Sequence, residues 1–387
     1  MSELLKYCNT QAQEIAVLGK EAGKTNREIA LEAGVSERSI RDMMAKVKTR
    51  ASSKGYDPDI GLNRPVAAHE ILRGRSELVD EDGNARLTWY KTSADQLRLD
   101  SLMENAVSAF SESIPRAKAV KPPKDGIEDL LNFFIITDYH VGMLAWADET
   151  GADWDVEIAE ETIIRWFGLA IKAAPKAQKA VFAQLGDFQH FDSLSAITPA
   201  SGHILDADTR YAKVVRVVIR IARRVTQMLL EKYPEVHVIW SDANHDPASA
   251  ILHREWLAAY MADEPRCFVD VNPGTFNCLE WGLTSIFTHH GHKKKVANVG
   301  DVFAAKYREV FGRTKFSYAH TGHFHSKELK ETNLMIVEQH RTLAAPDAYA
   351  ARGGWISGRD ASVITYHKKY GEVSRSVISF NMIEDSK

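Results

Sequence analysis

The sequence predicts an α/β domain that follows a small, all-helical N-terminal segment. From about residue 130 onward, apolar runs typical of buried strands alternate with amphipathic runs typical of helices, the order found in α/β domains with parallel strands. Clusters of acids and histidines follow these strand-like runs. Because ligands bind beyond the carboxyl ends of strands in such sheets, we expect the functional site at that edge.

The composition is that of an ordinary globular protein. The chain has 387 residues, enough for two domains, with 44% hydrophobic and 26% charged residues. A formal net charge of −3 does not indicate a nucleic-acid binder, but it excludes none, because charge can be segregated along the chain. No apolar run approaches the roughly 20 residues that span a bilayer, and the N-terminus lacks the pattern of a signal peptide.

The cysteines predict a reducing compartment. Cys8, Cys267 and Cys278 are odd in number and far apart, which argues against both a disulfide framework and a thiolate metal site. We therefore expect a cytoplasmic protein without a membrane anchor.

Residues 1–54 have the pattern of a helix-turn-helix module. Thr25 and Glu28 have the spacing of a capping box, Gly34 marks a tight turn, and Ser36 can cap the following helix. In this arrangement the second helix can enter the major groove of DNA. The candidate DNA-binding residues on that helix are Arg38, Arg41, Lys46 and Lys48. The alternative is a protein–protein module with a solvated basic face.

Residues 55–128 are predicted to connect this module to the main domain. Two strand-like runs flank an Asp-Gly turn within residues 75–92, which predicts a hairpin. A helix is expected over residues 94–114, and the Pro- and Lys-rich residues 115–126 are typical of a linker. The main domain is then expected to occupy residues 129–387.

Polar side chains recur at the end of each strand-like run of the main domain. They are Asp138, His140, Asp187, His190, Asn244, His245, Asp246, His289, His290, His323 and His325. Carboxylates, imidazoles and one carboxamide are suitable ligands for two divalent metal ions. Since alternate residues of a strand face the same side, the pairs 138/140 and 323/325 are predicted to point together if the strands continue that far.

These clusters occur as five motifs in a characteristic order. The motifs are "DYH" at 138–140, "GD" at 186–187, "ANHD" at 243–246, "HHGH" at 289–292 and "GHFH" at 322–325. Together they resemble the motif set of the calcineurin-like metallophosphoesterases, over roughly residues 130–345. The resemblance implies a β-sandwich flanked by helices that hydrolyses phosphoesters. One departure is Ala243, where the family usually has glycine; it alters a tight turn but removes no ligand.

The resemblance also implies a ligand set. Two metals would be bridged by Asp187, one of them held by Asp138, His140 and His325, and the other by Asn244, His290 and His323. His290 is preferred to His289 because it directly precedes Gly291. Manganese is the first expectation for both ions, with iron, nickel, zinc and magnesium as alternatives.

Three further residues receive catalytic roles from the resemblance. His245 would stabilise charge or protonate the leaving oxygen, with Asp246 orienting it. A hydroxide bridging the two metals would attack phosphorus. His190, within "GDFQH", matches a functional histidine of double-strand-break repair nucleases, so it would contact substrate; a structural histidine is the alternative.

The N-terminal module favours DNA as the substrate, because a tethered DNA-binding module raises the local concentration of enzyme on DNA. A DNA nuclease is therefore the first hypothesis. The combination also resembles bacteriophage-encoded metallophosphoesterases, which would place the protein in a bacterial or phage-infected cell. The alternatives are a phosphomonoesterase or cyclic-nucleotide phosphodiesterase, a protein phosphatase, and a non-catalytic DNA-binding regulatory protein. Assembly into a homo-oligomer stays open.

Overall fold

The computed structural model describes residues 3–57, 62–63, 70–79, 85–94, 116–123, 125–199 and 201–386. The chain divides into two compact units, Met1–Ala106 and Val107–Lys387. This division falls inside the predicted connector, and the domain boundaries at 54/55 and 128/129 stay predictions.

Three α-helices form the core of the N-terminal unit after a short 3-10 helix. The elements are η1 (Glu3–Tyr7), α1 (Gln11–Glu21), α2 (Asn26–Ala33) and α3 (Glu37–Ser53). The predicted capping box is present, since Thr25 and Glu28 exchange side-chain and backbone hydrogen bonds at the start of α2. Gly34 ends α2 in the left-handed conformation with φ 65°, and Ser36 caps α3. These local signals were therefore read correctly from the sequence.

The predicted hairpin is also present in this unit. Strands β3 (Glu70–Val79) and β4 (Ala85–Ala94) pair antiparallel, as do the short strands β1 (Tyr56–Asp57) and β2 (Leu62–Asn63). The turn at residues 80–84 lies outside the described residues. So does the helix predicted over residues 94–114, except for the residue that ends β4.

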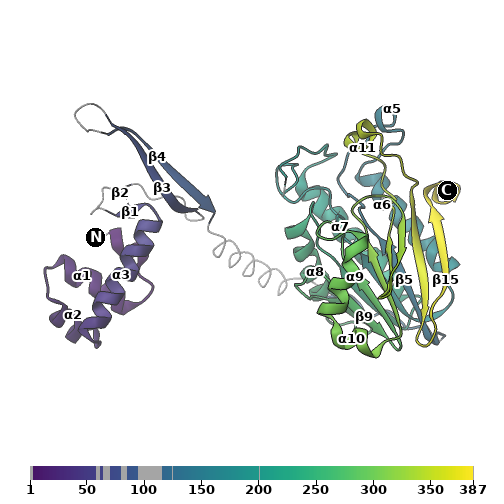
Figure 1. Ribbon diagram of the computed structural model, residues 1–387, viewed down its shortest axis with the longest axis horizontal. Helices are drawn as coiled ribbons and strands as arrows, with labels where there is room; N and C mark the ends of the chain where they lie inside the picture. Colours follow the sequence, from purple (N-terminus) through teal and green to yellow (C-terminus); the bar gives the residue numbers. More distant parts are fainter. Residues whose placement is uncertain are drawn as a thin grey trace. The chain divides into compact units, whose positions relative to one another are not determined.

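Two sheets form the centre of the C-terminal unit (Figure 1). The first has the order β15-β14-β5-β6-β7-β8, in which β5 to β8 run parallel. Strand β14 pairs antiparallel with β5, and β15 pairs antiparallel with β14. Its strands are β5 (Ile127–Ile136), β6 (Ala177–Gln184), β7 (Glu235–Trp240), β8 (Cys267–Asp270), β14 (Asp360–His367) and β15 (Gly371–Ser379).

The second sheet has the order β12-β13-β11-β10-β9, with β10, β11 and β13 parallel. Its strands are β9 (Asn277–Trp281), β10 (Thr284–Thr288), β11 (Phe316–Thr321), β12 (Glu328–Glu331) and β13 (Ile336–Gln339). Both sheets thus contribute parallel strands whose carboxyl ends carry the predicted motifs.

Helices cover the outer faces of both sheets. Those packed on the first sheet are α6 (Val156–Ala173), α7 (Tyr211–Leu230) and α8 (Pro247–Met261), while α9 (Val296–Lys306) packs on the second. The remaining helices are α5 (Ala147–Thr150), α10 (Arg308–Arg313), α11 (Ala348–Gly353) and α12 (Phe380–Glu384). The apolar stripe of α7 explains its packing, because its buried residues recur at three- and four-residue spacing.

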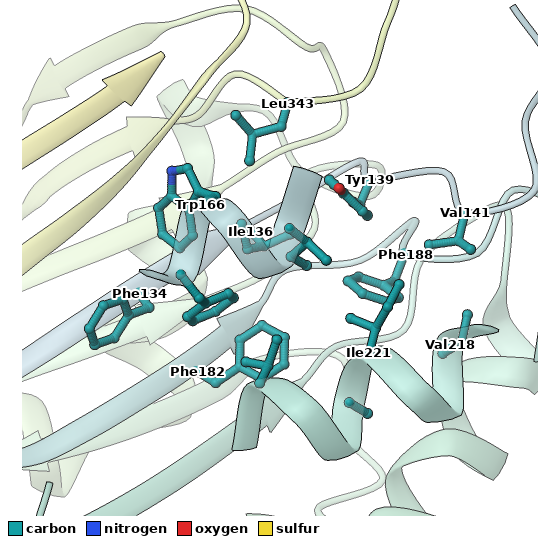
Figure 2. Close-up of a cluster of buried hydrophobic side chains, with 14 of the residues drawn as sticks. Phe134, Ile136, Tyr139, Val141, Trp166, Phe182, Phe188, Val218, Ile221 and Leu343 are labelled. Carbon is teal, nitrogen blue, oxygen red and sulfur yellow. The ribbon is translucent and has the colours of Figure 1, made fainter. Parts of the chain in front are cut away.

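Side chains of β5 alternate between the two sides of the first sheet. Phe133 and Ile135 enter the cluster between the sheets. Phe134 and Ile136 enter the cluster under the helices, where Figure 2 shows them near Trp166. The result is a β-sandwich flanked by helices, which confirms the predicted fold class. No helix in the described part of the chain is long and apolar enough to cross a membrane.

Candidate metal centre

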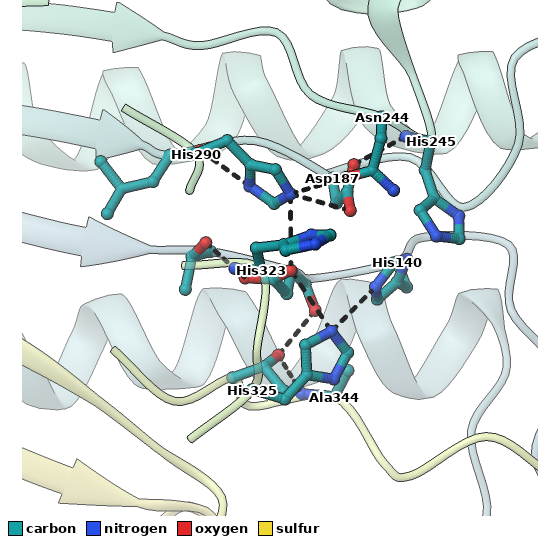
Figure 3. A network of polar contacts seen from close by, with 12 residues as sticks. His140, Asp187, Asn244, His245, His290, His323, His325 and Ala344 are labelled. Atoms are coloured by element: carbon teal, nitrogen blue, oxygen red, sulfur yellow. Dashed lines mark hydrogen bonds and ion pairs between the residues drawn. The ribbon is translucent and has the colours of Figure 1, made fainter. Parts of the chain in front are cut away.

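The predicted ligands all stand in loops directly after strands. Figure 3 shows the side chains of His140, Asp187, Asn244, His290, His323 and His325 gathered in one place. Three of these strands belong to the first sheet and two to the second. The loops after β5, β6, β7, β10 and β11 supply Asp138 and His140, Asp187, Asn244, His290, and His323 and His325, respectively. One edge of the sandwich therefore brings all seven predicted ligands together.

The backbone at five of these ligands is left-handed. Within the described residues, the non-glycine residues with positive φ are Asp138, His140, Asp187, His323 and His325, with φ between 48° and 75°. Such a conformation costs about 1–3 kcal/mol at each residue and is typical of functional sites. The strands do not continue to the pairs 138/140 and 323/325, because β5 ends at Ile136 and β11 at Thr321, so the condition for aligning these pairs by strand geometry is not met. Turns, and not the pleat, direct these side chains inward.

Backbone hydrogen bonds hold the first two loops together. The amide of Asp138 donates to the carbonyl of Gly186 at 3.0 Å, and the amide of His140 donates to the carbonyl of Asp187 at 3.0 Å. A Cβ atom on Gly322 would overlap Thr137 Oγ1 and Asp138 Oδ2. Glycine before the "HFH" run therefore has a steric reason, which is the close approach of the fifth loop to the first.

Asp138 presents one bare oxygen to the centre. Its Oδ2 accepts hydrogen bonds from the Thr137 hydroxyl at 2.6 Å and from the His323 amide at 2.8 Å. Its Oδ1 is buried and accepts none, although Nε2 of His325 lies 3.3 Å away and Nε2 of His290 lies 3.8 Å away. An unpartnered buried carboxylate oxygen is costly unless a cation fills the site.

His290 is oriented in the same way. Its Nδ1 lies 3.1 Å from the carbonyl of Leu185, so the N–H points there and Nε2 turns its lone pair to the centre. That Nε2 atom is 3.0 Å from Asp187 Oδ2 and 3.2 Å from Asn244 Oδ1. The neighbouring His289 stacks on Phe276 instead, so the structure brings His290, and not His289, into the centre.

The ligand atoms form two groups that suit two divalent ions. One group is Asp138, His140 and His325, and the other is Asp138, Asp187, His290 and His323; within each group the atoms lie within 4.8 Å of one another. Asn244 joins the second group through its contact with His290. Asp138 belongs to both groups and Asp187 to one, so the bridging role of Asp187 stays a prediction. Imidazole and carboxylate donors in these numbers fit manganese, iron or zinc.

The electrostatics of the centre favour a positive charge between its carboxylates. Burial alone would raise the pKa of Asp138, but His290 and His325 hold that pKa below its ordinary value. Burial alone would lower the pKa of His290, but Asp187 and Asp138 raise it to about 9. The carboxylates therefore stabilise whichever cation occupies the centre, a proton or a metal ion.

His245 is oriented by a different group from the one predicted. Its Nδ1 lies 2.9 Å from the carbonyl of His190, whereas Oδ2 of Asp246 accepts a hydrogen bond from the Gln189 amide at 2.9 Å. The prediction that Asp246 orients His245 directly is thus wrong. Because Gln189 precedes His190 in the chain, Asp246 instead fixes the backbone that carries the accepting carbonyl.

The His190 ring contacts a ligand. It is buried, and its Nδ1 lies 3.3 Å from Nδ1 of His140. Burial and the neighbouring His245 lower the pKa of His190 to about 3, so the ring is neutral at ordinary pH. This arrangement orients His140, and contact of His190 with a substrate stays a prediction.

A cleft of about 950 Å³ opens over the centre. Residues of the centre, including His140, Asn244 and His245, line it together with residues from two segments, 201–206 and 342–359. No site residue was predicted in either segment, since none of the five motifs falls there. It also missed Thr342, whose hydroxyl donates to the carbonyl of Asp138 at 2.7 Å. The predicted DNA-binding residues belong to α3 of the N-terminal unit, where all four are exposed.

No protein-family model and no curated protein matches the chain. Among solved structures, a predicted phosphoesterase from Streptococcus pneumoniae is 11% identical, covering 65% of this chain and 98% of that one with a TM-score of 0.29. An archaeal phosphodiesterase is 12% identical, covering 64% and 99% with a TM-score of 0.32. Zinc-bound Vps29 from Entamoeba histolytica is 12% identical, covering 65% and 99% with a TM-score of 0.27.

With TM-scores this low, the fold and the site rest on the chain's own strands and side chains. Two packed sheets, outer helices and five ligand-bearing loops at one edge are the features that the motifs predicted. The chain therefore has a two-sheet α/β sandwich flanked by helices, with the predicted ligands in loops at one edge.

Proposed function

We propose that this protein is a metal-dependent phosphodiesterase that hydrolyses DNA. One observation supports the chemistry: the seven predicted ligands converge in two adjoining groups, at the floor of a cleft that a phosphoester can enter. Two divalent cations bound there would supply Lewis-acid stabilisation of the phosphate and would activate a water molecule. The side chains that would hold them are Asp138, His140, Asp187, Asn244, His290, His323 and His325.

The remaining residues of the site position groups and stabilise charge. His245 lines the cleft, and its Nδ1 is engaged with the His190 carbonyl. Its Nε2 is therefore the atom that can stabilise a phosphate oxygen, or protonate the leaving oxygen when the ring is charged. His190 orients His140 from behind. The Leu185 carbonyl, which faces Nδ1 of His290, keeps Nε2 of that ring turned toward Asp187 and Asn244.

The charge pattern of α3 supports DNA as the substrate. Its buried residues are Ile40, Val47 and Ala51, which occupy one side of the helix. The other side is exposed and carries Arg38, Arg41, Lys46 and Lys48. Basic side chains on the outer face of a helix that follows a tight glycine turn match the phosphate contacts of a DNA-binding helix.

A substrate panel tests the proposal. With Mn²⁺, the full chain is expected to hydrolyse bis(p-nitrophenyl) phosphate and to cleave DNA, and to act far more slowly on the monoester p-nitrophenyl phosphate. Cleavage of the monoester alone would overturn the phosphodiesterase proposal. Hydrolysis of RNA or cyclic dinucleotides, with DNA untouched, would leave the diester chemistry standing and overturn the choice of DNA.

Variants of α3 test whether the N-terminal unit contributes DNA binding separately from hydrolysis at the metal centre. Replacing both Arg38 and Arg41 by Ala should weaken DNA binding about tenfold and lower its dependence on salt concentration. Hydrolysis of the small diester should not change. The double variant Lys20→Ala/Arg27→Ala is a matched control, because it removes the same charge from exposed positions on α1 and α2. Equal DNA affinities for the two variants would contradict DNA binding by α3.

A further inference from the structure

One wall of the cleft carries aromatic side chains that are largely exposed to solvent. Tyr349 is 70% exposed and Trp355 is 59% exposed, and both line the cleft. Their ring centroids lie 5.0 Å apart with the planes at 57°. The same segment begins at Thr342, which contacts the Asp138 carbonyl. One chain segment, 342–359, therefore carries both the two aromatic rings and the residue that contacts the metal-ligand loop.

The local backbone holds these rings in place. Asp347 caps α11 by accepting a hydrogen bond from the Ala350 amide at 2.7 Å, and the amide of Trp355 donates to the Ala350 carbonyl at 3.1 Å. A Cβ atom on Gly353 would lie 3.0 Å from the ring of Trp355. The indole thus rests against a glycine backbone, which fixes its position.

An ion pair also anchors α11 to its neighbour. Arg352 contacts Glu149 of α5 at 2.8 Å, and the two helices pack together at one end of the unit (Figure 1). Since α11 is capped and braced in this way, its aromatic rings form a preformed surface.

The size of the cleft indicates that the substrate reaches beyond its phosphate. About 950 Å³ is near the upper end of the range for small-molecule sites, roughly 300–1,000 Å³. A phosphate group held between the metal ligands fills only the floor of such a space. Apolar residues Ile204 and Leu205 of the other segment also line it, so the remaining volume suits a planar, apolar group.

We propose that Tyr349 and Trp355 stack on a nucleobase next to the scissile phosphate, and that the enzyme therefore acts on unpaired strands or strand ends. This inference rests on the proposed phosphodiesterase function, because the base is the planar apolar group that a nucleic acid offers. A base within a duplex has both faces covered by its neighbours, so it must leave the stack before it can meet these rings. Stacking on aromatic side chains tolerates any base.

Dinucleoside monophosphates test the inference, because each has a single scissile bond. The Mn²⁺-loaded full chain is assayed on three substrates. They are thymidylyl-thymidine, its analogue without the 5′-side base and its analogue without the 3′-side base. Removal of one of the two bases is expected to raise KM about tenfold, whereas kcat changes little. Trp355→Ala should raise KM for the intact dinucleotide by a similar factor, with no further effect on the analogue that lacks the stacked base.

Two variants control this experiment. Trp355→Phe should restore most of the affinity, since a ring remains. Tyr370→Ala, at an exposed position between β14 and β15, should leave all three KM values unchanged. Equal KM values with and without bases, or equal effects of Trp355→Ala on all three substrates, would overturn the stacking inference alone. If none of the three were cleaved, and no DNA either, the proposed function would fail and the inference with it.

Discussion

Two buried histidine clusters lie close together along β11, and their chemistry differs. The metal centre takes His323 and His325 from the loop after this strand, whereas His320, within the strand, belongs to a cluster with Glu338 and His340. The ligating atoms of that second cluster also lie within 4.8 Å of one another. By composition and proximity alone, either could be taken for a metal site.

The second cluster is internally satisfied. Nδ1 of His320 lies 2.9 Å from Nε2 of His340, and Nε2 of His320 lies 2.8 Å from the hydroxyl of Tyr366. Glu338 accepts a hydrogen bond from Arg375 at 2.7 Å, so its charge is already neutralised. In the metal centre, by contrast, Oδ1 of Asp138 accepts no hydrogen bond.

The backbone separates the clusters as well. The residues of the second cluster have ordinary φ values, whereas five ligands of the metal centre are left-handed. The unpartnered Asp138 oxygen and the left-handed backbone together favour a cation site at the first cluster, and the satisfied contacts favour a structural role for the second.

The largest expected effect comes from a matched pair of carboxylate-to-amide changes, one in each cluster. Asp187→Asn removes a charge that faces His290 at 3.0 Å, so it should lower bound metal and reduce diesterase activity at least about 10³-fold, given the several kcal/mol that metal ions supply. Glu338→Gln should keep the wild-type metal content and most of the activity. Its cost should appear as about 1–3 kcal/mol of unfolding free energy, because the hydrogen bond from Arg375 loses its charged acceptor.

Elemental analysis of the purified variants, together with assays of bis(p-nitrophenyl) phosphate hydrolysis, checks this pair. If Glu338→Gln lost metal as Asp187→Asn does, the second cluster would be a metal site too. If Asp187→Asn kept full activity, the assignment of the first cluster would be wrong.

A smaller effect is expected from His245→Ala, which tests a residue beside the metal ligands. We expect kcat to fall about 10²-fold, as for the loss of a general acid, with the metal content unchanged. The loss should be larger for DNA than for a p-nitrophenyl ester, because p-nitrophenolate leaves readily without a proton. Similar losses on both substrates would favour charge stabilisation over proton donation, and metal loss would contradict both roles.

The motifs pointed to these residues because metal chemistry restricts the residue types of ligands, and because parallel strands bring their carboxyl ends to one edge. They did not predict how the ligands converge, since the turns at Asp138 and His323 depend on contacts between loops far apart in sequence. The hydrogen-bond partner of His245 could not be predicted either, because that partner is the backbone carbonyl of His190. Every residue type has such a carbonyl, so the sequence carries no sign of it. No site residue was predicted in the cleft walls, because none of the metal-ligand motifs falls in these segments.

Helices and strands with a clear hydrophobic period could be predicted from the sequence, whereas short strands could not. Strand β5 and helix α7 show their periods in the sequence, and the structure has both. The second histidine cluster was not anticipated, because Glu338 and His340 lie on or next to β13, which is only four residues long. Such a short strand carries too few residues to show a period.

The smallest effect on activity is expected in the second cluster, where pH tests whether its histidines are structural. Burial lowers the pKa of His340 to about 4, against an ordinary value of about 6.5. Between these two values the unfolded chain binds a proton that the folded chain does not, so stability falls as the pH is lowered from about 6.5 to about 4. His340→Gln should flatten this dependence by up to about 1.4 kcal/mol per pH unit.

At pH 7, His340→Gln should cost about 1 kcal/mol through its lost bond to His320, while diesterase activity and metal content stay near wild type. Urea unfolding with a chelator present, at several pH values, measures both quantities without interference from bound metal. His203→Gln, at an exposed position, should leave the stability of the protein as it is. An unchanged pH profile for His340→Gln would mean that this histidine accepts a proton in the folded state, so the second cluster would hold a positive charge as the metal centre does.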